Sequence, residues 1–267
     1  METYKGSGKI ENEAKRLSLL AIIANEESER VLGKIKESGF SPKVIADFGC
    51  GTGDAFGVFE SVFPGASLIG IDQSEKALAL ANNRYPKAKL ITANVTENCA
   101  FSDLLNRLGK VDLAYFRNML LHLPDPATVL RNAKNHLSDE GILFAQEPDW
   151  NTAEANWEDF SIFKDTLTAM MQKFKINPYM GKQLKTILEE AGFCKIKIDV
   201  STRKVAPTDP AWEILYSLLE VGGERLTPFL QERGIANVQE MREKMESARK
   251  IKGSYYKTPA WVIAWGG

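Results

Sequence analysis

The sequence has few residues that could bind a metal ion or form a disulfide. Its 267 residues include three cysteines and two histidines, and these form no CxxC pair or other spacing typical of a metal site. Cys50, Cys99 and Cys194 are odd in number, so we expect them to be reduced thiols. The sequence therefore predicts a cytoplasmic protein without a bound metal.

The chain also lacks an excess of either charge and a long hydrophobic run. The chain has 34 Lys and Arg residues and 35 Asp and Glu residues, which gives a net charge of −1. It therefore lacks the excess of positive charge that is typical of proteins that bind nucleic acid or an anionic membrane. The N-terminal segment METYKGSGKIENEAKR contains no signal-peptide core, and the run LSLLAIIA is far shorter than the ~20 residues that cross a bilayer. We expect no nucleic-acid partner and no membrane partner, while a homodimer stays open.

An apolar segment followed by a glycine-rich turn is the most informative motif in the chain. Residues 44–57 read VIADFGCGTGDAFG, so an apolar strand with Asp47 near its end leads into the GxGxG run from Gly49 to Gly53. Glycine tolerates positive φ and lets a ligand approach the backbone closely. Asp54 stands where a dinucleotide-binding loop has its third glycine, and two carboxylates beside the turn favour a cation over a phosphate. The motif predicts a small-molecule site, and a turn used only for packing is the alternative.

This GxGxG run, preceded by an acidic residue, resembles the first motif of the class I S-adenosylmethionine-dependent methyltransferases. The cofactor of that family carries a sulfonium and an amino group and no phosphate, which suits an acidic turn. The resemblance is strong over residues 42–148, and the order of the predicted elements supports it elsewhere. It implies that S-adenosylmethionine is bound by Asp47, Gly49, Cys50, Gly51, Asp72, Gln73, Asn94, Val95 and Arg117.

The next two predicted strands continue this resemblance. SLIGIDQS ends in Asp72, about 25 residues after Asp47, which is close to the spacing of an acid that binds a ribose diol. NAD enzymes share that acid, so it indicates an adenosine ligand and not a reaction. Helix capping is the alternative role, although Ser74 fits the N-cap better. The strand AKLITANV ends at Asn94 and Val95, which the resemblance places against the adenine, although Asp is commoner there than Asn.

A fourth strand, VDLAYF, is followed by the segment RNMLLHLPDP. Arg117 can bind the cofactor carboxylate or form a structural salt bridge, and Arg16 competes for that role. His122 is the candidate general base, because it is one of two histidines and follows this strand. Packing beneath the cofactor is its alternative role. His136 is expected on the surface or in the last turn of a helix.

The fifth strand, GILFAQEPDW, ends in a group of residues that can face the methyl acceptor. The family resemblance implies an acceptor pocket built from the N-terminal helix, the loop after this strand and the insertion before the last strand. Tyr4, Glu147 and Trp150 are the candidates for acceptor contacts. Glu147 and Asp149 can attract an amine or orient a hydroxyl, and they can equally cap the following segment. The aromatic side chains in these regions favour an apolar or aromatic small molecule.

Strand and helix patterns alternate without a flexible linker, which predicts a single α/β domain over residues 1-267. We expect a helical N-terminal lid at 1-40, a cofactor-binding core at 41-150 and substrate-side helices with closing strands at 151-267, including a helical insertion at 209-252. The resemblance implies a doubly wound seven-stranded sheet of order 3-2-1-4-5-7-6 with the last strand antiparallel. Core helices are predicted to begin near Gly53, Ser74, Cys99 and Pro126, and a late strand to span 194–200.

Methyl transfer from a sulfonium needs mainly the alignment of a nucleophile and the exclusion of water. We therefore expect metal-independent, direct in-line transfer of a methyl group from S-adenosylmethionine to a small molecule of secondary metabolism. An NAD(P)-linked reductase is one alternative, and Asp54 argues against it. A module that binds S-adenosylmethionine without catalysis is the other.

Overall fold

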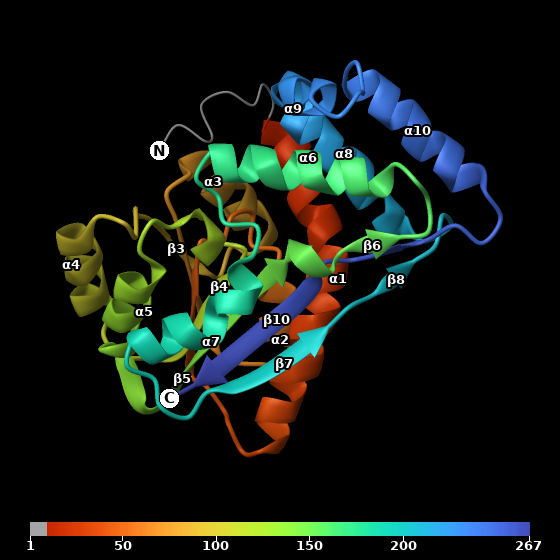
Figure 1. Ribbon diagram of the computed structural model, residues 1–267. Coiled ribbons are helices and arrows are strands. Elements are labelled where there is room, and N and C mark those ends of the chain that lie inside the picture. The colour runs from red at the N-terminus through yellow and green to blue at the C-terminus, as the bar shows by residue number, and fades with distance from the viewer. Residues whose placement is uncertain (1–9) are drawn as a thin grey trace. The chain divides into compact units, whose positions relative to one another are not determined.

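The computed structural model describes residues 10–267, with side chains described for 15–97 and 103–267 (Figure 1). The described chain divides into two compact units. The first, which we call the sheet unit, consists of residues 24–148, 180–200 and 261–267. The second, the helical unit, consists of residues 149–179 and 201–260 together with the described residues up to 23. The expected single domain stays a prediction, and Tyr4 lies outside the described residues.

The sheet unit is built on a seven-stranded sheet of order β3-β2-β1-β4-β5-β10-β7 (Figure 1). Counted in chain order within this sheet, the order is 3-2-1-4-5-7-6 with β10 antiparallel, which confirms the expected fold class. β1 pairs in parallel with β2 and β4, and its sequence VIADF is buried almost throughout, as expected for a central parallel strand. The strands are β1 (Val44–Phe48), β2 (Ser67–Asp72), β3 (Lys89–Thr92), β4 (Val111–Arg117), β5 (Leu137–Asp149), β7 (Lys197–Ser201) and β10 (Ala260–Gly266).

Local sequence signals set the starts of two of the helices between these strands, α3 and α5. Ser74 accepts a hydrogen bond from the N–H of Ala77 and caps α3, and Asp125 caps α5 with Pro126 in its first turn. α2 begins at Phe56, later than expected, because Gly53 still lies in the turn with positive φ. The helices are α1 (Ile10–Glu37), α2 (Phe56–Val62), α3 (Glu75–Arg84), α4 (Asn98–Leu108), the 3-10 helix η1 (Leu120–His122), α5 (Pro126–Lys134) and α7 (Met180–Glu190).

One hydrophobic core packs α1 and α2 against the sheet. Leu32 of α1 and Phe59 of α2 are fully buried in the same cluster as Tyr115 of β4 and Phe144 of β5. The ring of Tyr115 lies edge to face with Phe59 at 4.9 Å between centroids and is stacked with Phe144 at 5.1 Å. These contacts fix the strands whose carboxyl ends carry the predicted site residues.

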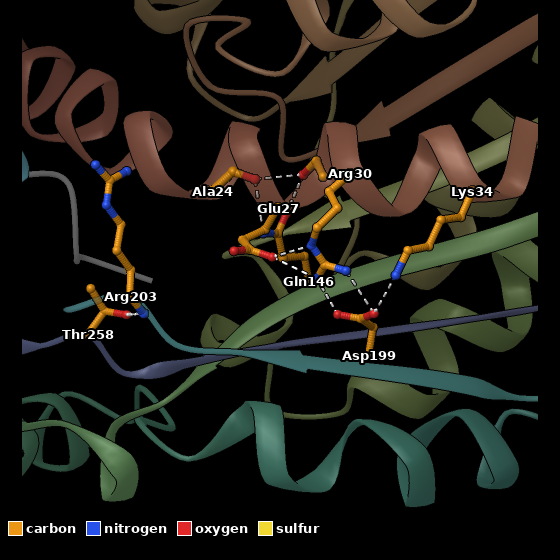
Figure 2. Close-up of polar contacts among 9 residues, drawn as sticks. Ala24, Glu27, Arg30, Lys34, Gln146, Asp199, Arg203 and Thr258 are labelled. Carbon is orange, nitrogen blue, oxygen red and sulfur yellow. Dashed lines mark hydrogen bonds and ion pairs between the residues drawn. The ribbon is translucent and has the colours of Figure 1, made fainter.

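Buried hydrogen bonds attach the later part of α1 to the sheet (Figure 2). Gln146 of β5 donates from Nε2 to the carbonyl oxygen of Ala24 at 3.1 Å, and its Oε1 lies 2.5 Å from the Oγ of Ser28. The hydroxyl groups of Ser28 and Tyr115 are 2.7 Å apart. Nearer the surface, Arg30 forms ion pairs with Glu27 of the same helix and with Asp199 of β7. The segment of α1 from Ala24 onward is therefore an integral part of the sheet unit.

The helical unit confirms the expected helical insertion and adds a small sheet that the sequence did not predict. Strands of two residues form the order β6-β9-β8 with antiparallel pairing. Its core includes Phe160 against Trp157 at 5.3 Å, and Tyr256 against Trp212 at 5.6 Å, between ring centroids. Its elements are η2 (Trp150–Thr152), β6 (Glu154–Ala155), α6 (Phe160–Lys173), β8 (Lys204–Val205), η3 (Pro210–Trp212), α8 (Glu213–Gly222), η4 (Gly223–Leu226), α9 (Thr227–Gln231), α10 (Val238–Lys250) and β9 (Tyr256–Lys257).

None of the helices in the described part of the chain is both long and apolar enough to cross a membrane. Within the same residues, no group of three or more His, Cys, Asp and Glu side chains is arranged to hold a metal ion. Cys50 is a buried free thiol and Cys194 an exposed one.

Candidate functional site

The glycine turn after β1 forms a loop whose backbone is bonded to β2. Gly49, Gly51 and Gly53 all have positive φ, at 78°, 54° and 76°. The N–H groups of Gly49 and Cys50 both donate to the carbonyl oxygen of Ile71, at 2.7 and 3.1 Å. We call residues 49–54 the glycine loop. Its alternating glycines are required by backbone conformation, since side chains are strained at these φ values.

Asp47 precedes the glycine loop and is buried, with 3 % of its surface exposed. Its pKa is raised to about 7, mainly by burial; the positive charge of Arg117 opposes the rise, and the negative charges of Asp72 and Asp54 contribute to it. Three carboxyl groups thus lie in or beside the loop, and the pKa of one of them, Asp47, is close to neutral pH. A cation bound there would favour the ionised form of Asp47 and would itself be stabilised.

Asp72, at the end of β2, ties the glycine loop to the start of α3. One carboxylate oxygen accepts from the N–H of Gly51 at 2.9 Å and the other from the N–H of Ser74 at 2.8 Å. Burial raises the pKa of this carboxyl group, and the backbone hydrogen bonds oppose that rise. A carboxylate has about four acceptor sites, so one remains for a ligand hydroxyl, and the ribose role and the loop-fixing role are compatible. The helix N-cap itself is Ser74, as the sequence indicated.

We expect Asp72→Ala to weaken binding of S-adenosylhomocysteine by about tenfold or more, because hydrogen bonds from a ribose to a carboxylate are lost. Stability should also fall by about 1–3 kcal/mol for each backbone N–H left without its acceptor. Asp72→Asn, which keeps one acceptor oxygen, should be intermediate in both respects. Calorimetric titration and thermal unfolding measure the two effects. Unchanged affinity together with reduced stability would show that Asp72 only supports the loop.

The predicted adenine contacts lie just beyond β3. That strand ends at Thr92, so Asn94 belongs to the following turn and not to the strand. Its Oδ1 accepts from the N–H of Thr96 at 3.1 Å, and its Nδ2 donates to Glu97 at 3.1 Å. Val95 is buried, and Gln73 is exposed beside Asp72. Asn94 therefore shapes this turn, while its contact with adenine stays a prediction.

Arg117, the last residue of β4, is joined to the glycine loop through α1. Its Nη1 donates to Oδ1 of Asn25, and Nδ2 of Asn25 donates to the carbonyl oxygen of Asp54 at 2.9 Å. On the other side of the loop, Arg84 donates to the carboxylate of Asp54 at 2.7 Å and to the carbonyl oxygen of Thr52 at 3.1 Å. Neither Asn25 nor Arg84 was predicted from the sequence as part of the site. Their partners are distant in the chain, and the only local signal is a polar residue directly after the apolar run LLAIIA.

The segment after β4 crosses close to the glycine loop. Asn118 has a φ of 51°, and η1 follows with His122 as its last residue. A Cβ placed on Gly49 would lie 2.6 Å from Cγ of Met119, so the methionine packs directly on the glycine backbone. His122 is half-buried, and its N–H donates to the carbonyl oxygen of Met119 at 3.1 Å. The structure thus places the candidate base on the segment that covers the glycine loop.

Glu147, at the end of β5, is fully buried and holds this same segment. Its Oε1 accepts from the N–H groups of Met119 and Leu120, at 2.9 and 2.7 Å. Its Oε2 has no hydrogen-bond partner among the described residues. Burial raises the pKa of Glu147 to about 8, although the two backbone donors oppose the rise. Gly181 of α7 approaches so closely that a Cβ there would lie 2.8 Å from the carbonyl oxygen of Glu147, which helps to explain the burial.

The remaining predicted residues lie in the helical unit or near the ends of helices. Asp149 accepts from the N–H of Asn151 at 3.1 Å and caps η2, so the capping alternative is confirmed for this residue. Trp150 is buried, and its N–H donates to the carbonyl oxygen of Pro178. The ring of His136 contacts the carbonyl oxygen of Asn132 in the last turn of α5, as expected.

Comparison with known proteins identifies the family. The methyltransferase domain family matches residues 40–192, more than half of the chain. An uncharacterized 37.1 kDa protein in transposon TN4556 of Streptomyces fradiae is 28% identical over 148 residues, which are 55% of this chain and 42% of that protein. Trans-aconitate 2-methyltransferase of Yersinia pseudotuberculosis is 30% identical over 109 residues, which are 41% of this chain and 40% of that protein. The chain thus spans about two fifths of the length of these curated relatives.

A solved structure extends the likeness in fold to nearly the whole chain. The plantazolicin methyltransferase BamL, in complex with a triazolic desmethylPZN analog and SAH, has a TM-score of 0.56 at 14% identity, over 99% of this chain and 92% of that one. The glycine loop and the sheet order define the class I S-adenosylmethionine-dependent methyltransferases. The chain belongs to the methyltransferase domain family, whose cofactor is S-adenosylmethionine.

Proposed function

We propose that the protein transfers a methyl group from S-adenosylmethionine to a small apolar or aromatic molecule by direct in-line displacement, without a metal ion. The observation that carries this proposal is the glycine loop flanked by buried Asp47 and by Asp72, since such a site favours a cationic, phosphate-free cofactor. In this proposal Asp72 binds the ribose, the glycine loop lies along the cofactor, and Arg117 binds the carboxylate of the cofactor. Asn94 and Val95 flank the adenine.

The methyl acceptor is proposed to contact Tyr4, Glu147 and Trp150. Trp150 and Tyr4 are candidates for apolar contacts, and Glu147, whose buried Oε2 has no hydrogen-bond partner among the described residues, is the candidate for a hydrogen bond to a polar group of the acceptor. His122 is the proposed general base for an acceptor that carries a proton on its nucleophilic atom. The names of two similar proteins, which act on trans-aconitate and on plantazolicin, support a small acceptor.

Cofactor choice and turnover test the proposal in turn. Calorimetric titration should give tighter binding of S-adenosylmethionine and S-adenosylhomocysteine than of NADH, because NADH brings a pyrophosphate to an acidic loop. A screen of small phenols, amines and indole-like compounds should then release S-adenosylhomocysteine with at least one acceptor. Tighter binding of NADH would favour the reductase. Cofactor binding without turnover across the screen would favour a non-catalytic module.

A further inference from the structure

Asn25 bridges two parts of the cofactor site, the glycine loop that follows β1 and the end of the neighbouring strand β4. Its amide donates to the backbone of the glycine loop at Asp54, and its carbonyl oxygen accepts from Arg117 at the end of β4. A single planar side chain therefore sets the separation between the loop and the guanidinium. Both hydrogen bonds span large distances in the sequence, so this connection arises only in the folded protein.

The backbone at Asn25 is held in place from the side facing the sheet. The preceding residue, Ala24, accepts hydrogen bonds at its carbonyl oxygen from Ser28 at 2.9 Å and from Gln146 at 3.1 Å (Figure 2). Further along α1, Arg30 pairs with Asp199 of β7. This part of the helix is therefore anchored to the sheet unit, and the role of residues 1-40 as a lid stays a prediction.

The other end of the connection is also fixed. Arg84 of α3 binds both the carboxylate of Asp54 and the carbonyl oxygen of Thr52, and the hydroxyl of Thr52 donates to Asp54 at 2.5 Å. Asn25 thus joins two anchored elements. Asp47 competes with it for the guanidinium, since the two opposite charges attract each other inside the site.

We propose that Asn25 is a positioning residue of the cofactor site, which orients Arg117 toward the carboxylate of S-adenosylmethionine and keeps it from pairing with Asp47. Without Asn25, the guanidinium of Arg117 and the carboxylate of Asp47 pair with each other. The carboxylate of the cofactor then loses Arg117 as its partner, and the amino group of the cofactor loses Asp47. The adenosine part is unaffected. This inference rests on the proposed carboxylate contact of Arg117 and needs no turnover.

Two ligands separate this role from a general effect on the fold. S-adenosylhomocysteine carries the amino-acid part, whereas 5′-methylthioadenosine keeps the adenosine and lacks both charges. We expect Asn25→Ala to weaken binding of S-adenosylhomocysteine about tenfold, as for one lost charge-assisted contact, and to change the affinity for 5′-methylthioadenosine less than twofold. Arg117→Met should show the same pattern, and the double variant should be no weaker than the stronger of the two single effects.

Asn83→Ala is the matched control, because it makes the same change at an exposed position of a helix. It should leave both affinities unchanged. Asn25→Asp keeps the shape of the side chain but places an anion beside Arg117, so it should also weaken S-adenosylhomocysteine selectively. Equal losses for both ligands, or additive effects of Asn25→Ala and Arg117→Met, would overturn the inference. Failure of the proposed methyl transfer would appear separately, as binding without turnover.

Discussion

Replacing Glu147 by Gln should make the protein more stable at pH 8 and leave its stability near pH 4 almost unchanged. The folded protein raises the pKa of this buried carboxyl group from 4.5 to about 8. Between these values the unfolded chain has released the proton while the folded chain retains it, so stability falls as pH rises. The fall attributable to Glu147 is on the order of 4 kcal/mol and is complete above pH 8. Gln is a neutral isostere and lacks this titration.

Urea unfolding at a series of pH values measures the difference between the two proteins. Glu140→Gln is the matched control, since Glu140 lies on the same strand and is exposed. It should preserve the slope of the wild-type protein, whereas Glu147→Gln should reduce it. Identical slopes for Glu147→Gln and the wild-type protein would show that Glu147 is not the titrating group. Near pH 4, Glu147→Ala should be less stable than the wild-type protein by about 2–5 kcal/mol, because Met119 and Leu120 lose their acceptor, and this difference should shrink as pH rises because Ala also lacks the titration.

Replacing His122 by Ala should lower turnover by ~10²–10⁴ for a phenol, hydroxyl or protonated amine acceptor, with little change in cofactor affinity. The physical reason is that such an acceptor must lose a proton as its nucleophilic atom takes the methyl group. An acceptor that is already nucleophilic needs only placement and should retain most of its rate. Comparing the two acceptor types in one variant therefore separates base catalysis from alignment.

His136→Ala is the control for His122→Ala, because it removes the other histidine of the sequence. Its ring is held by Asn132 and Asn106, so its loss should affect stability and not the rate. Turnover is followed by release of S-adenosylhomocysteine, and affinity by calorimetry. If His122→Ala loses cofactor binding together with activity, the residue supports the segment above the glycine loop and is not the base.

Much of the sheet unit could be predicted because its signals are local. An apolar run followed by alternating glycines predicts β1 and the glycine loop. Ser74 and Asp125 are N-cap residues, and they mark the starts of α3 and α5. The end of β3, at Thr92, could not be predicted in the same way. Asn94 looks like a strand residue in the sequence, but its side chain bonds to Thr96 and Glu97 and shapes the turn.

What the sequence could not predict depends on contacts between distant residues. Asn25 and Asp54 are 29 positions apart, and no periodic pattern links them. Glu147 reads as an acid at the open end of a strand, whereas two backbone donors from the β4 segment and the close approach of Gly181 bury it. β6, β8 and β9 have two residues each, too few for an alternating pattern to be recognised.

The hydrogen bonds from the glycine loop to β2 order the loop before a ligand binds. Because Gly49 and Cys50 donate to Ile71 and Gly51 donates to Asp72, the conformational entropy of the loop is lost when the chain folds. A ligand therefore binds to a preorganised backbone, and its binding free energy does not include the entropy lost in ordering the loop. Its binding enthalpy should therefore report mainly the contacts it forms, and the unfavourable entropy of ordering should arise from the ligand's own rotatable bonds.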